Sequence, residues 1–284
     1  MAKQAGSLYV VATPIGNLQD ISARALDILG RVAQIAAEDT RHSRKLLSHY
    51  GIGTPLTALH EHNEVEQAGR LLRDLEAGRD LALITDAGTP LISDPGYHLV
   101  QTVRAAGVRV VPVPGPAACI AALSAAGLPS DRFVFEGFLP TKPAARRQRL
   151  EVLRDEPRTL IFYESPHRVV DCLDDMADVF GTGRQAVIAR ELSKLYETIE
   201  DGTLAALTDW ITADPDQQKG EFVILVHGAP ARDRTDIDAH DQRVLQLLLQ
   251  ELSLKQAVAL AAKITGLPKN RLYEKGIALK TDQS

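Results

Sequence analysis

The sequence predicts an α/β fold: two α/β domains with a cleft between them, followed by a small C-terminal helical domain of the helix-turn-helix kind. Up to residue 228, short apolar runs alternate with segments of helical periodicity, which is typical of sheets covered by helices. Residues 228–241 are polar and charged, as expected of a linker. Apolar residues then return at helical spacing. We therefore expect domains at residues 1–128, 129–228 and 241–284.

The first domain is predicted to contain a mostly parallel sheet. Its strands are expected at residues 8–12, 35–37, 81–84 and 108–113. Each is a short apolar run that stops at a turn or at the start of a helical period. Strands that alternate with helices in this way lie parallel and are covered on both faces.

The second domain is predicted to contain a mixed sheet. It begins near Pro129, after a helix expected over residues 117–126. Its strands are expected at residues 133–138, 160–164, 186–191, 196–202 and 221–226. Several of them follow each other without a long helix between them, so they cannot all be parallel.

The C-terminal segment is predicted to form three short helices. Ser253 and Gln256 make a capping-box pair, Gly266 turns the chain, and Pro268 suits the first turn of a third helix. Residues 241–284 carry seven Lys or Arg against four Asp or Glu, a net charge of +3 in a chain of −5. This domain either packs with solvated lysines or contacts RNA, for which Lys269 and Arg271 are the candidate residues.

The composition is that of an ordinary globular protein, with 45% hydrophobic and 24% charged residues. The net charge of −5 argues against coating nucleic acid by bulk charge but allows local basic patches. No apolar run is long enough to cross a bilayer, and the start lacks the apolar stretch of a signal peptide. Cys119 and Cys172 are too few for a disulfide framework or a metal cluster. We expect a cytoplasmic protein with both cysteines buried, no metal and no membrane contact.

Four loops that follow strands predict a ligand site: residues 13–17, 86–90, 114–118 and 162–166. Gly and Ala let backbone groups approach a ligand closely, and Pro fixes the turn. Ligands of open α/β sheets bind beyond the carboxyl ends of the strands, where these loops lie. The sequence lacks Gly-x-Gly-x-x-Gly after the first strand, a phosphate-binding loop and a Gly-x-Ser-x-Gly elbow, so it lacks the ordinary sites of those classes.

The motifs at these loops carry a family resemblance. They are residues 13–18 (TPIGNL), 37–42 (AEDTRH), 86–96 (DAGTPLISDPG) and 163–168 (YESPHR). Together they resemble the small-subunit ribosomal RNA methyltransferase I family, a branch of the tetrapyrrole (corrin/porphyrin) methylase superfamily, and the resemblance covers residues 7–280. It implies a homodimer that binds S-adenosylmethionine in the cleft between two α/β domains and needs no metal. It also implies 2′-O-methylation of a cytidine ribose in the decoding region of 16S rRNA, within the assembled small ribosomal subunit.

The same loops give a hypothesis for the cofactor pocket. Backbone groups at Ala87 and Gly88 would hold the methionine part, Asp86 would lie near a cationic group, and residues 162–163 and 221–223 would flank adenine. The candidate cofactor-binding residues are Pro14, Gly16, Asp86, Ala87, Gly88, Leu91, Ala117, Ala118, Phe162, Tyr163, Glu221, Phe222 and Val223. The alternatives are simple packing for Ala117, Ala118 and Phe222, and a turn-capping carboxylate for Asp86.

A ribose hydroxyl needs a group that removes or polarises its proton. Glu38 and Asp39 are the candidate catalytic residues, although Asp39 also suits the N-cap of a following helix; His60 and His62 are further candidates, equally suited to a surface role. Candidate RNA-binding residues are Arg41, His42, Arg146, Arg147 and Arg149. The last three would otherwise be a solvated helix face.

Two other functions stay open at this point. One is methylation of a tetrapyrrole small molecule, which would use the same fold and cofactor; the basic helical tail and residues 38–42 speak against it. The other is a non-catalytic RNA-binding assembly factor, against which the intact set of cleft loops speaks.

Overall fold

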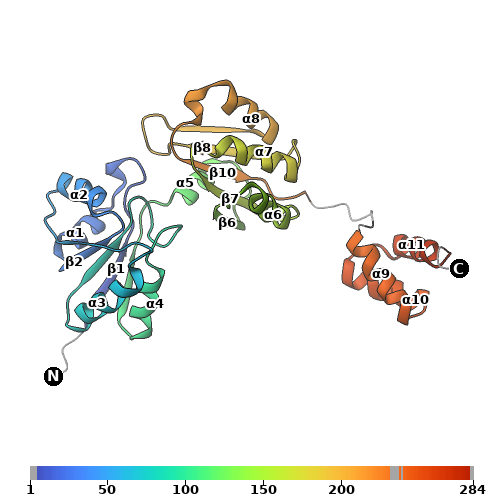
Figure 1. Cartoon of the computed structure of the whole chain (residues 1–284), viewed down its shortest axis with the longest axis horizontal. Helices are drawn as coiled ribbons and strands as arrows, with labels where there is room; N and C mark the ends of the chain where they lie inside the picture. Colours follow the sequence, from blue (N-terminus) through green and yellow to red (C-terminus); the bar gives the residue numbers. More distant parts are fainter. Residues whose placement is uncertain (1–4, 231–236, 238, 282–284) are drawn as a thin grey trace. The chain divides into compact units, whose positions relative to one another are not determined.

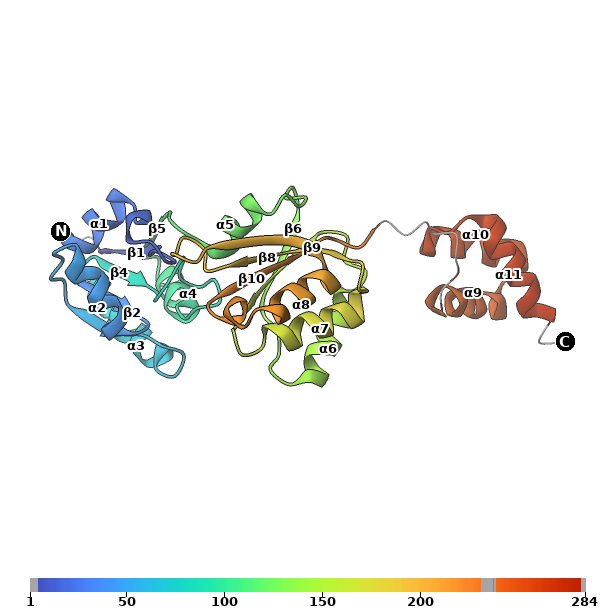
Figure 2. The same cartoon turned by 90° about the horizontal axis from the view of Figure 1, so that it is seen from above.

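The computed structural model describes residues 5–230, 237 and 239–281. The chain forms two compact units that divide between Gly228 and Ala229. Within the described residues, the first unit contains two five-stranded sheets and the second contains three helices (Figures 1 and 2). The predicted linker falls largely on residues 231–236 and 238, which lie outside the described residues.

The first sheet is parallel throughout, as the sequence predicts. Its strand order is β3-β2-β4-β1-β5. The strands are β1 (Ser7–Val11), β2 (Gln34–Ala37), β3 (Leu56–Ala58), β4 (Leu81–Ile84) and β5 (Arg109–Val113). All of β4 is buried, because this central strand is covered by helices on both faces.

The helices of this half divide between the two faces of the sheet. They are α1 (Ala23–Arg31), α2 (Thr40–His49), α3 (Glu64–Glu76) and α4 (Tyr97–Ala105), with a short 3-10 helix at Leu18–Asp20. Apolar residues of α1 and α2 pack on one face, around Ile35 and Ile84. Those of α3 and α4 pack on the other, around Leu8 and Leu83. The alternation of side chains along each strand produces these two cores.

The second sheet is mixed, which confirms the prediction. Its order is β6-β7-β10-β8-β9; β6 and β7 are parallel, and the other pairs are antiparallel. The strands are β6 (Phe133–Phe138), β7 (Thr159–Glu164), β8 (Gln185–Arg190), β9 (Thr198–Thr203) and β10 (Phe222–Val226). Strand β9 begins two residues later than predicted, because the carboxylate of Glu197 turns back to accept a hydrogen bond from the backbone N–H of Ser193.

Helices cover both faces of the second sheet. They are α5 (Ala118–Ala125), α6 (Pro143–Leu153), α7 (Val169–Phe180) and α8 (Leu204–Ala213), with a 3-10 helix at Pro215–Gln218. Helices α6, α7 and α8 pack on the face that contains Phe162 and Ile224. Helix α5 packs on the opposite face, beside Ile161 and Val223 (Figures 1 and 2). Both cysteines are buried and free, as expected.

Strand β6 contains a bulge next to β7. Phe135 pairs with Ile161 and Gly137 with Phe162, so Glu136 is an extra residue. Gly137 has a φ of +65°, which a glycine adopts without strain. A Cβ atom at this position would lie 3.0 Å from the Ser93 Oγ of the first half. The bulge therefore occurs where the two halves of the unit approach each other.

The second unit is a three-helix bundle. Its helices are α9 (Ala239–Glu251), α10 (Leu254–Thr265) and α11 (Lys269–Thr281). The predicted capping box of Ser253 and Gln256 opens α10, and Gly266 ends it in the left-handed conformation. Leu245, Ala261 and Leu272 are among the residues of its core. None of the helices within the described ranges is long and apolar enough to cross a membrane.

Candidate active site

The two halves of the first unit enclose a cavity of about 300 Å³, at the lower end of the range for small-molecule sites. One wall comes from loops after the strands of the first sheet: Ile15, Ala87, Gly88, Thr89, Ile92, Ser93 and Asp94. The other wall comes from the second sheet and its loops: Phe138, Tyr163, Glu164, Ser165, Pro166, Ala189, Leu192, Glu221, Phe222 and Val223. Ala117 and Ala118, at the start of α5, lie between them.

Backbone hydrogen bonds join the loops of the first wall. The N–H of Thr13 donates to Gly88 O at 2.9 Å, and the N–H of Gly88 donates back to Thr13 O at 3.1 Å. Gly88 has a φ of +86°, so a side chain here would be strained. The hydroxyl of Thr89 donates to Pro116 O at 2.9 Å. Three of the four predicted loops are therefore held together, and the small residues at Ala87 and Gly88 leave space in front of them.

The loop between β4 and α4 has an unusual backbone. Leu91 and Ser93 have φ values of +73° and +68°, although neither is a glycine. The carboxylate of Glu64 supports this loop: Oε1 accepts hydrogen bonds from the N–H groups of Gly96 and Leu99, both at 3.1 Å. Glu64 is 5% exposed and is the first residue of α3. Its negative charge lies at the N-terminus of α4, where a helix favours an anion.

Asp94 is the carboxylate that this loop brings to the cavity wall. Burial raises the pKa of Asp94 to about 7, and the negative charge of Glu38 contributes to the increase. Burial also raises the pKa of Asp86, which accepts a hydrogen bond from the N–H of Asp39 at 3.1 Å. Glu38 accepts one from the Thr85 hydroxyl at 2.6 Å. Asp94 is therefore a carboxylate that can accept a proton near neutral pH.

Tyr163 is the centre of the second wall. Its hydroxyl oxygen accepts a hydrogen bond from the N–H of Cys119 at 3.0 Å, in the first turn of α5. The rings of Phe135 and Phe138 meet it edge-on, with centroids 5.0 and 5.7 Å away. Burial raises the pKa of Tyr163, so the hydroxyl stays protonated. This side chain fixes the start of α5, and with it Ala117 and Ala118, relative to the sheet.

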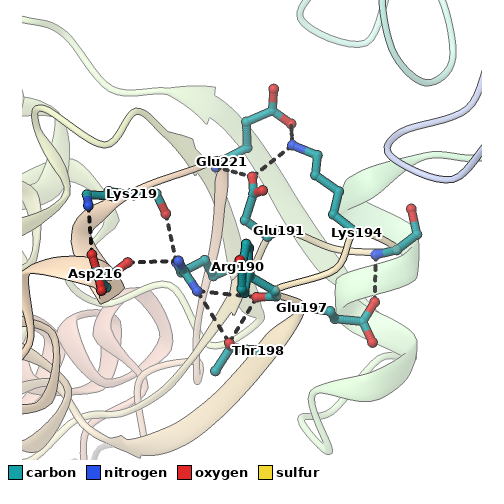
Figure 3. Close-up of polar contacts among 10 residues, drawn as sticks. Arg190, Glu191, Lys194, Glu197, Thr198, Asp216, Lys219 and Glu221 are labelled. Atoms are coloured by element: carbon teal, nitrogen blue, oxygen red, sulfur yellow. Dashed lines mark hydrogen bonds and ion pairs between the residues drawn. The ribbon is translucent and has the colours of Figure 1, made fainter.

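The loop between β8 and β9 borders the cavity with Leu192. Lys194 Nζ bridges Glu191 Oε1 at 2.8 Å and Glu221 Oε2 at 3.0 Å, as Figure 3 shows. This loop also contacts the first wall, because a Cβ atom on Gly16 would lie 2.8 Å from Leu192 O. A glycine at position 16 therefore allows the two halves to approach closely here.

Eight of the predicted cofactor-binding residues line the cavity: Ala87, Gly88, Ala117, Ala118, Tyr163, Glu221, Phe222 and Val223. Five do not: Pro14, Gly16, Asp86, Leu91 and Phe162. Phe162 belongs to the core on the opposite face of β7, since successive residues of a strand point to opposite sides. Leu91 packs toward the core around Leu83 and Leu99.

The predicted catalytic residues lie near the cavity but do not line it. The Asp39 side chain accepts a hydrogen bond from the N–H of Arg41 at 2.7 Å and caps α2, as the alternative interpretation proposed. The hydrogen bond also lowers the pKa of Asp39. His60 and His62 are exposed, and neither lines the cavity. Sequence reasoning missed Asp94 as a site residue, although it lies within the motif at residues 86–96.

The predicted RNA-binding residues fall into two groups. Arg146 must be corrected: it is 3% exposed and forms a buried ion pair with Asp175, so its guanidinium is not available to RNA. Arg147 forms an ion pair with the same aspartate, and Arg149 forms one with Glu136. Both positive charges are therefore already paired within the protein. Six candidates have exposed side chains: Arg41, His42, Arg147, Arg149, Lys269 and Arg271.

Comparisons with known proteins agree over most of the chain. Residues 7–208 match the family described as Tetrapyrrole (Corrin/Porphyrin) Methylases. Residues 235–280 match the RsmI C-terminal HTH domain. "Ribosomal RNA small subunit methyltransferase I" of Pseudomonas aeruginosa is 62% identical over 96% of this chain and 97% of its own length. The protein of that name from Haemophilus influenzae is 54% identical over 98% of this chain and 99% of its own length.

Solved structures are similar at the level of the fold. The crystal structure of the methyltransferase CobJ superposes with a TM-score of 0.59 at 20% sequence identity. The superposition covers 80% of this chain and 96% of that one. The fold of the two sheets is therefore shared with a protein whose sequence has diverged widely.

Proposed function

Because the chain belongs to the tetrapyrrole (corrin/porphyrin) methylase family, and within it to the ribosomal RNA small subunit methyltransferase I group, we propose that it transfers a methyl group from S-adenosylmethionine to the 2′-hydroxyl of a cytidine ribose in 16S rRNA. The observation that carries the proposal is the cavity between the two sheets. Its walls combine close backbone approach, apolar side chains and one carboxylate with a pKa near 7.

The residues of the cavity fit S-adenosylmethionine. Ala87 is exposed at the cavity and would offer its backbone groups to the polar methionine part, while Gly88, with a φ of +86° and both backbone groups bonded to Thr13, holds the loop in place. Val223 offers apolar surface to the adenine ring, and Phe222 borders the cavity although its side chain lies in the core around Phe162. Ala117 and Ala118 are small enough to leave room for the ligand. When bound, S-adenosylmethionine supplies an electrophilic methyl group on a positively charged sulfur.

We assign the role of general base to Asp94. The carboxylate would accept the proton of the ribose 2′-hydroxyl as the hydroxyl oxygen takes the methyl group that bound S-adenosylmethionine would supply, the sulfur leaving as a neutral thioether. A base with a pKa near the working pH is well matched to this task. Glu38 and Asp39, the residues selected from the sequence, act through Asp94: Glu38 by its charge, and Asp39 by its N–H bond to Asp86.

The RNA contacts are proposed at two places. Arg41 and His42 lie in the first turns of α2, next to Glu38, and both are exposed. Lys269 and Arg271 open α11 of the helical unit, which carries the excess of basic residues. Such side chains bind phosphate oxygens and position an RNA without reading its sequence. The assembled small ribosomal subunit is the proposed substrate, which places the reaction in the cytoplasm, and the proposed active form is a homodimer.

Transfer of labelled methyl groups tests the proposal directly. Purified protein is incubated with labelled S-adenosylmethionine and small subunits from cells that lack this chain, and the modified ribose is mapped by its resistance to alkaline cleavage. We expect label at one cytidine ribose and none in subunits that already carry the modification. Label transferred to a tetrapyrrole instead, or no label although the cofactor binds, would reject the proposed activity.

A further inference from the structure

The loop between β8 and β9, residues 191–197, exposes two large apolar side chains. Leu195 is 87% exposed and Tyr196 is 66% exposed. They are adjacent in the chain, and none of the functions assigned above uses them. The same loop contributes Leu192 to the cavity wall three residues earlier. An exposed apolar pair so close to a substrate site suggests contact with a binding partner.

Polar contacts hold this loop in a defined shape (Figure 3). The carbonyl of Tyr196 accepts hydrogen bonds from Arg190 Nη1 at 3.2 Å and from the Thr198 hydroxyl at 3.1 Å. Arg190 also donates to two carbonyls of the segment before β10, so the loop is attached to the sheet at its base. The N–H of Ser193 donates to Glu197 at 2.6 Å. The side chain of Tyr196 therefore projects from a backbone that is held in one conformation.

The backbone of the loop is strained as well as fixed. Glu191 and Ser193 have φ values of +51° and +61°, a region that residues with side chains seldom adopt. Strain of this kind persists where the surrounding contacts determine the conformation, and it is frequent at ligand-binding sites. Here the bridging Lys194 and the contact with Gly16 supply those contacts. Because the backbone is already fixed, only the side chain of Tyr196 loses conformational entropy when a partner binds to it.

We infer that Tyr196, with Leu195 beside it, is a stacking platform for an unpaired RNA base that flanks the methylated nucleotide. This inference rests on the proposed function. A ribose in folded RNA can reach a cavity of this size only when its strand is opened, and the neighbouring bases then lose stacking partners. An exposed aromatic ring on the loop that borders the cavity would replace one of those partners, whatever the base.

The charges around the platform are compatible with this role. Lys194 pairs with the carboxylates of Glu191 and Glu221 and neutralises one of their two charges, so contact here is expected with the face of a base and not with phosphate groups. A second copy of the chain is a weaker candidate for the occupant. A stable subunit interface buries about 1,200 Å² or more in total, whereas this patch consists of two side chains flanked by charged residues such as Lys194 and Glu197.

Substitution of Tyr196 tests the inference with small subunits as the probe. For Tyr196→Ala we expect the KM for subunits to rise by about 5- to 150-fold, which corresponds to about 1–3 kcal/mol for one stacked base. Tyr196→Phe and Tyr196→Trp should keep a KM near that of the wild type, because they keep a ring face. The Kd for S-adenosylmethionine, measured by calorimetry, should change less than about twofold, since the platform lies outside the cavity.

A matched control and three outcomes make the test decisive. Val152→Ala removes an equally exposed apolar side chain from α6 and should leave the KM unchanged. An unchanged KM for Tyr196→Ala, or a Tyr196→Phe variant as weak as Tyr196→Ala, overturns the inference. A loss of activity accompanied by a lower mass in sedimentation also overturns it, since the loop would then be a subunit contact. A wild-type chain that methylates no subunits would instead overturn the proposed function.

Discussion

The two walls of the cavity are built in different ways. The wall from the first sheet consists of loops, in which Gly88, Leu91 and Ser93 have positive φ values and backbone groups are held by hydrogen bonds. The wall from the second sheet consists mainly of side chains from regular strands, such as Tyr163, Ala189 and Val223. We infer a division of work: the first wall positions the reacting groups, and the second provides surface for binding.

This difference predicts how substitutions in the two walls should behave. A change in the first wall should act mainly on the rate of methyl transfer, because it displaces or removes a reacting group. A change in the second wall should act mainly on cofactor affinity, because it removes contact surface or support. The four predictions that follow test this division, beginning with the largest expected effect.

Asp94→Asn should have the largest effect. We expect kcat to fall by about 10²- to 10⁴-fold, the usual contribution of a general base, while S-adenosylmethionine still binds. Single-turnover methyl transfer and calorimetry measure the two quantities separately. Asp27→Asn, which changes a carboxylate on the surface of α1, serves as the control. If Asp94→Asn retains more than a tenth of the wild-type rate, another group removes the proton.

Glu64→Gln should weaken the same wall without touching the cavity. The buried carboxylate holds the N–H groups of Gly96 and Leu99, and its charge strengthens both bonds. We expect the free energy of unfolding, measured with urea, to fall by about 1–3 kcal/mol. We also expect kcat to fall more than cofactor affinity, because the loop that carries Asp94 loses support. Glu66 is an exposed residue in the first turn of the same helix. Glu66→Gln should therefore change neither the free energy of unfolding nor kcat.

The pH dependence of the rate should reveal the influence of Glu38. Because the pKa of Asp94 is about 7, the base is protonated below that pH, and kcat/KM should rise with pH through about 7. Glu38→Gln removes a negative charge that raises this pKa, so the acid limb should move to lower pH. Near about pH 6 the gain should stay below about tenfold, the change that one full pKa unit gives. Inactivity of Glu38→Gln at all pH values would instead make Glu38 the base.

Tyr163→Phe should have the smallest effect and should act on binding. It removes the acceptor for the N–H of Cys119 at the start of α5, which costs about 0.5–1.5 kcal/mol. We expect the affinity for S-adenosylmethionine to fall by roughly 2- to 10-fold, with kcat for bound subunits little changed. Tyr97→Phe changes an exposed tyrosine on α4 and is the matched control. A fall in kcat without a fall in affinity would contradict the proposed division between the walls.

The sequence predicts the sheets well, because their signals are local. Short apolar runs such as residues 81–84, followed by turns that contain Gly and Pro, are typical of buried strands. The parallel first sheet and the mixed second sheet follow from the spacing of the helices. The packing of α5 is not local: the predicted boundary near Pro129 places this helix with the first half, yet it packs on the second sheet.

The site is harder to predict because it depends on side-chain direction. Phe162 and Tyr163 are adjacent in one strand, and only the residue that faces α5 reaches the cavity. Asp94 follows Leu91 and Ser93, whose positive φ values have no signal in their residue types. The burial of Arg146 did have a signal, since it stands four and seven residues before Leu150 and Leu153 on the buried face of α6.

The extra residue in β6 sets the orientation of everything after it. In a regular strand Phe135 and Phe138 would point to opposite faces, but with Glu136 inserted both rings meet Tyr163. If the strand had no bulge, Glu136 would pair with Phe162 and every later residue of β6 would move by one position, as in a frameshift within a gene. Each cavity residue would still be present in the chain, yet Phe138 would turn toward the core and a glycine would take its place beside Tyr163. The shape of the cavity is thus encoded in the number of residues along an edge strand as well as in their identities.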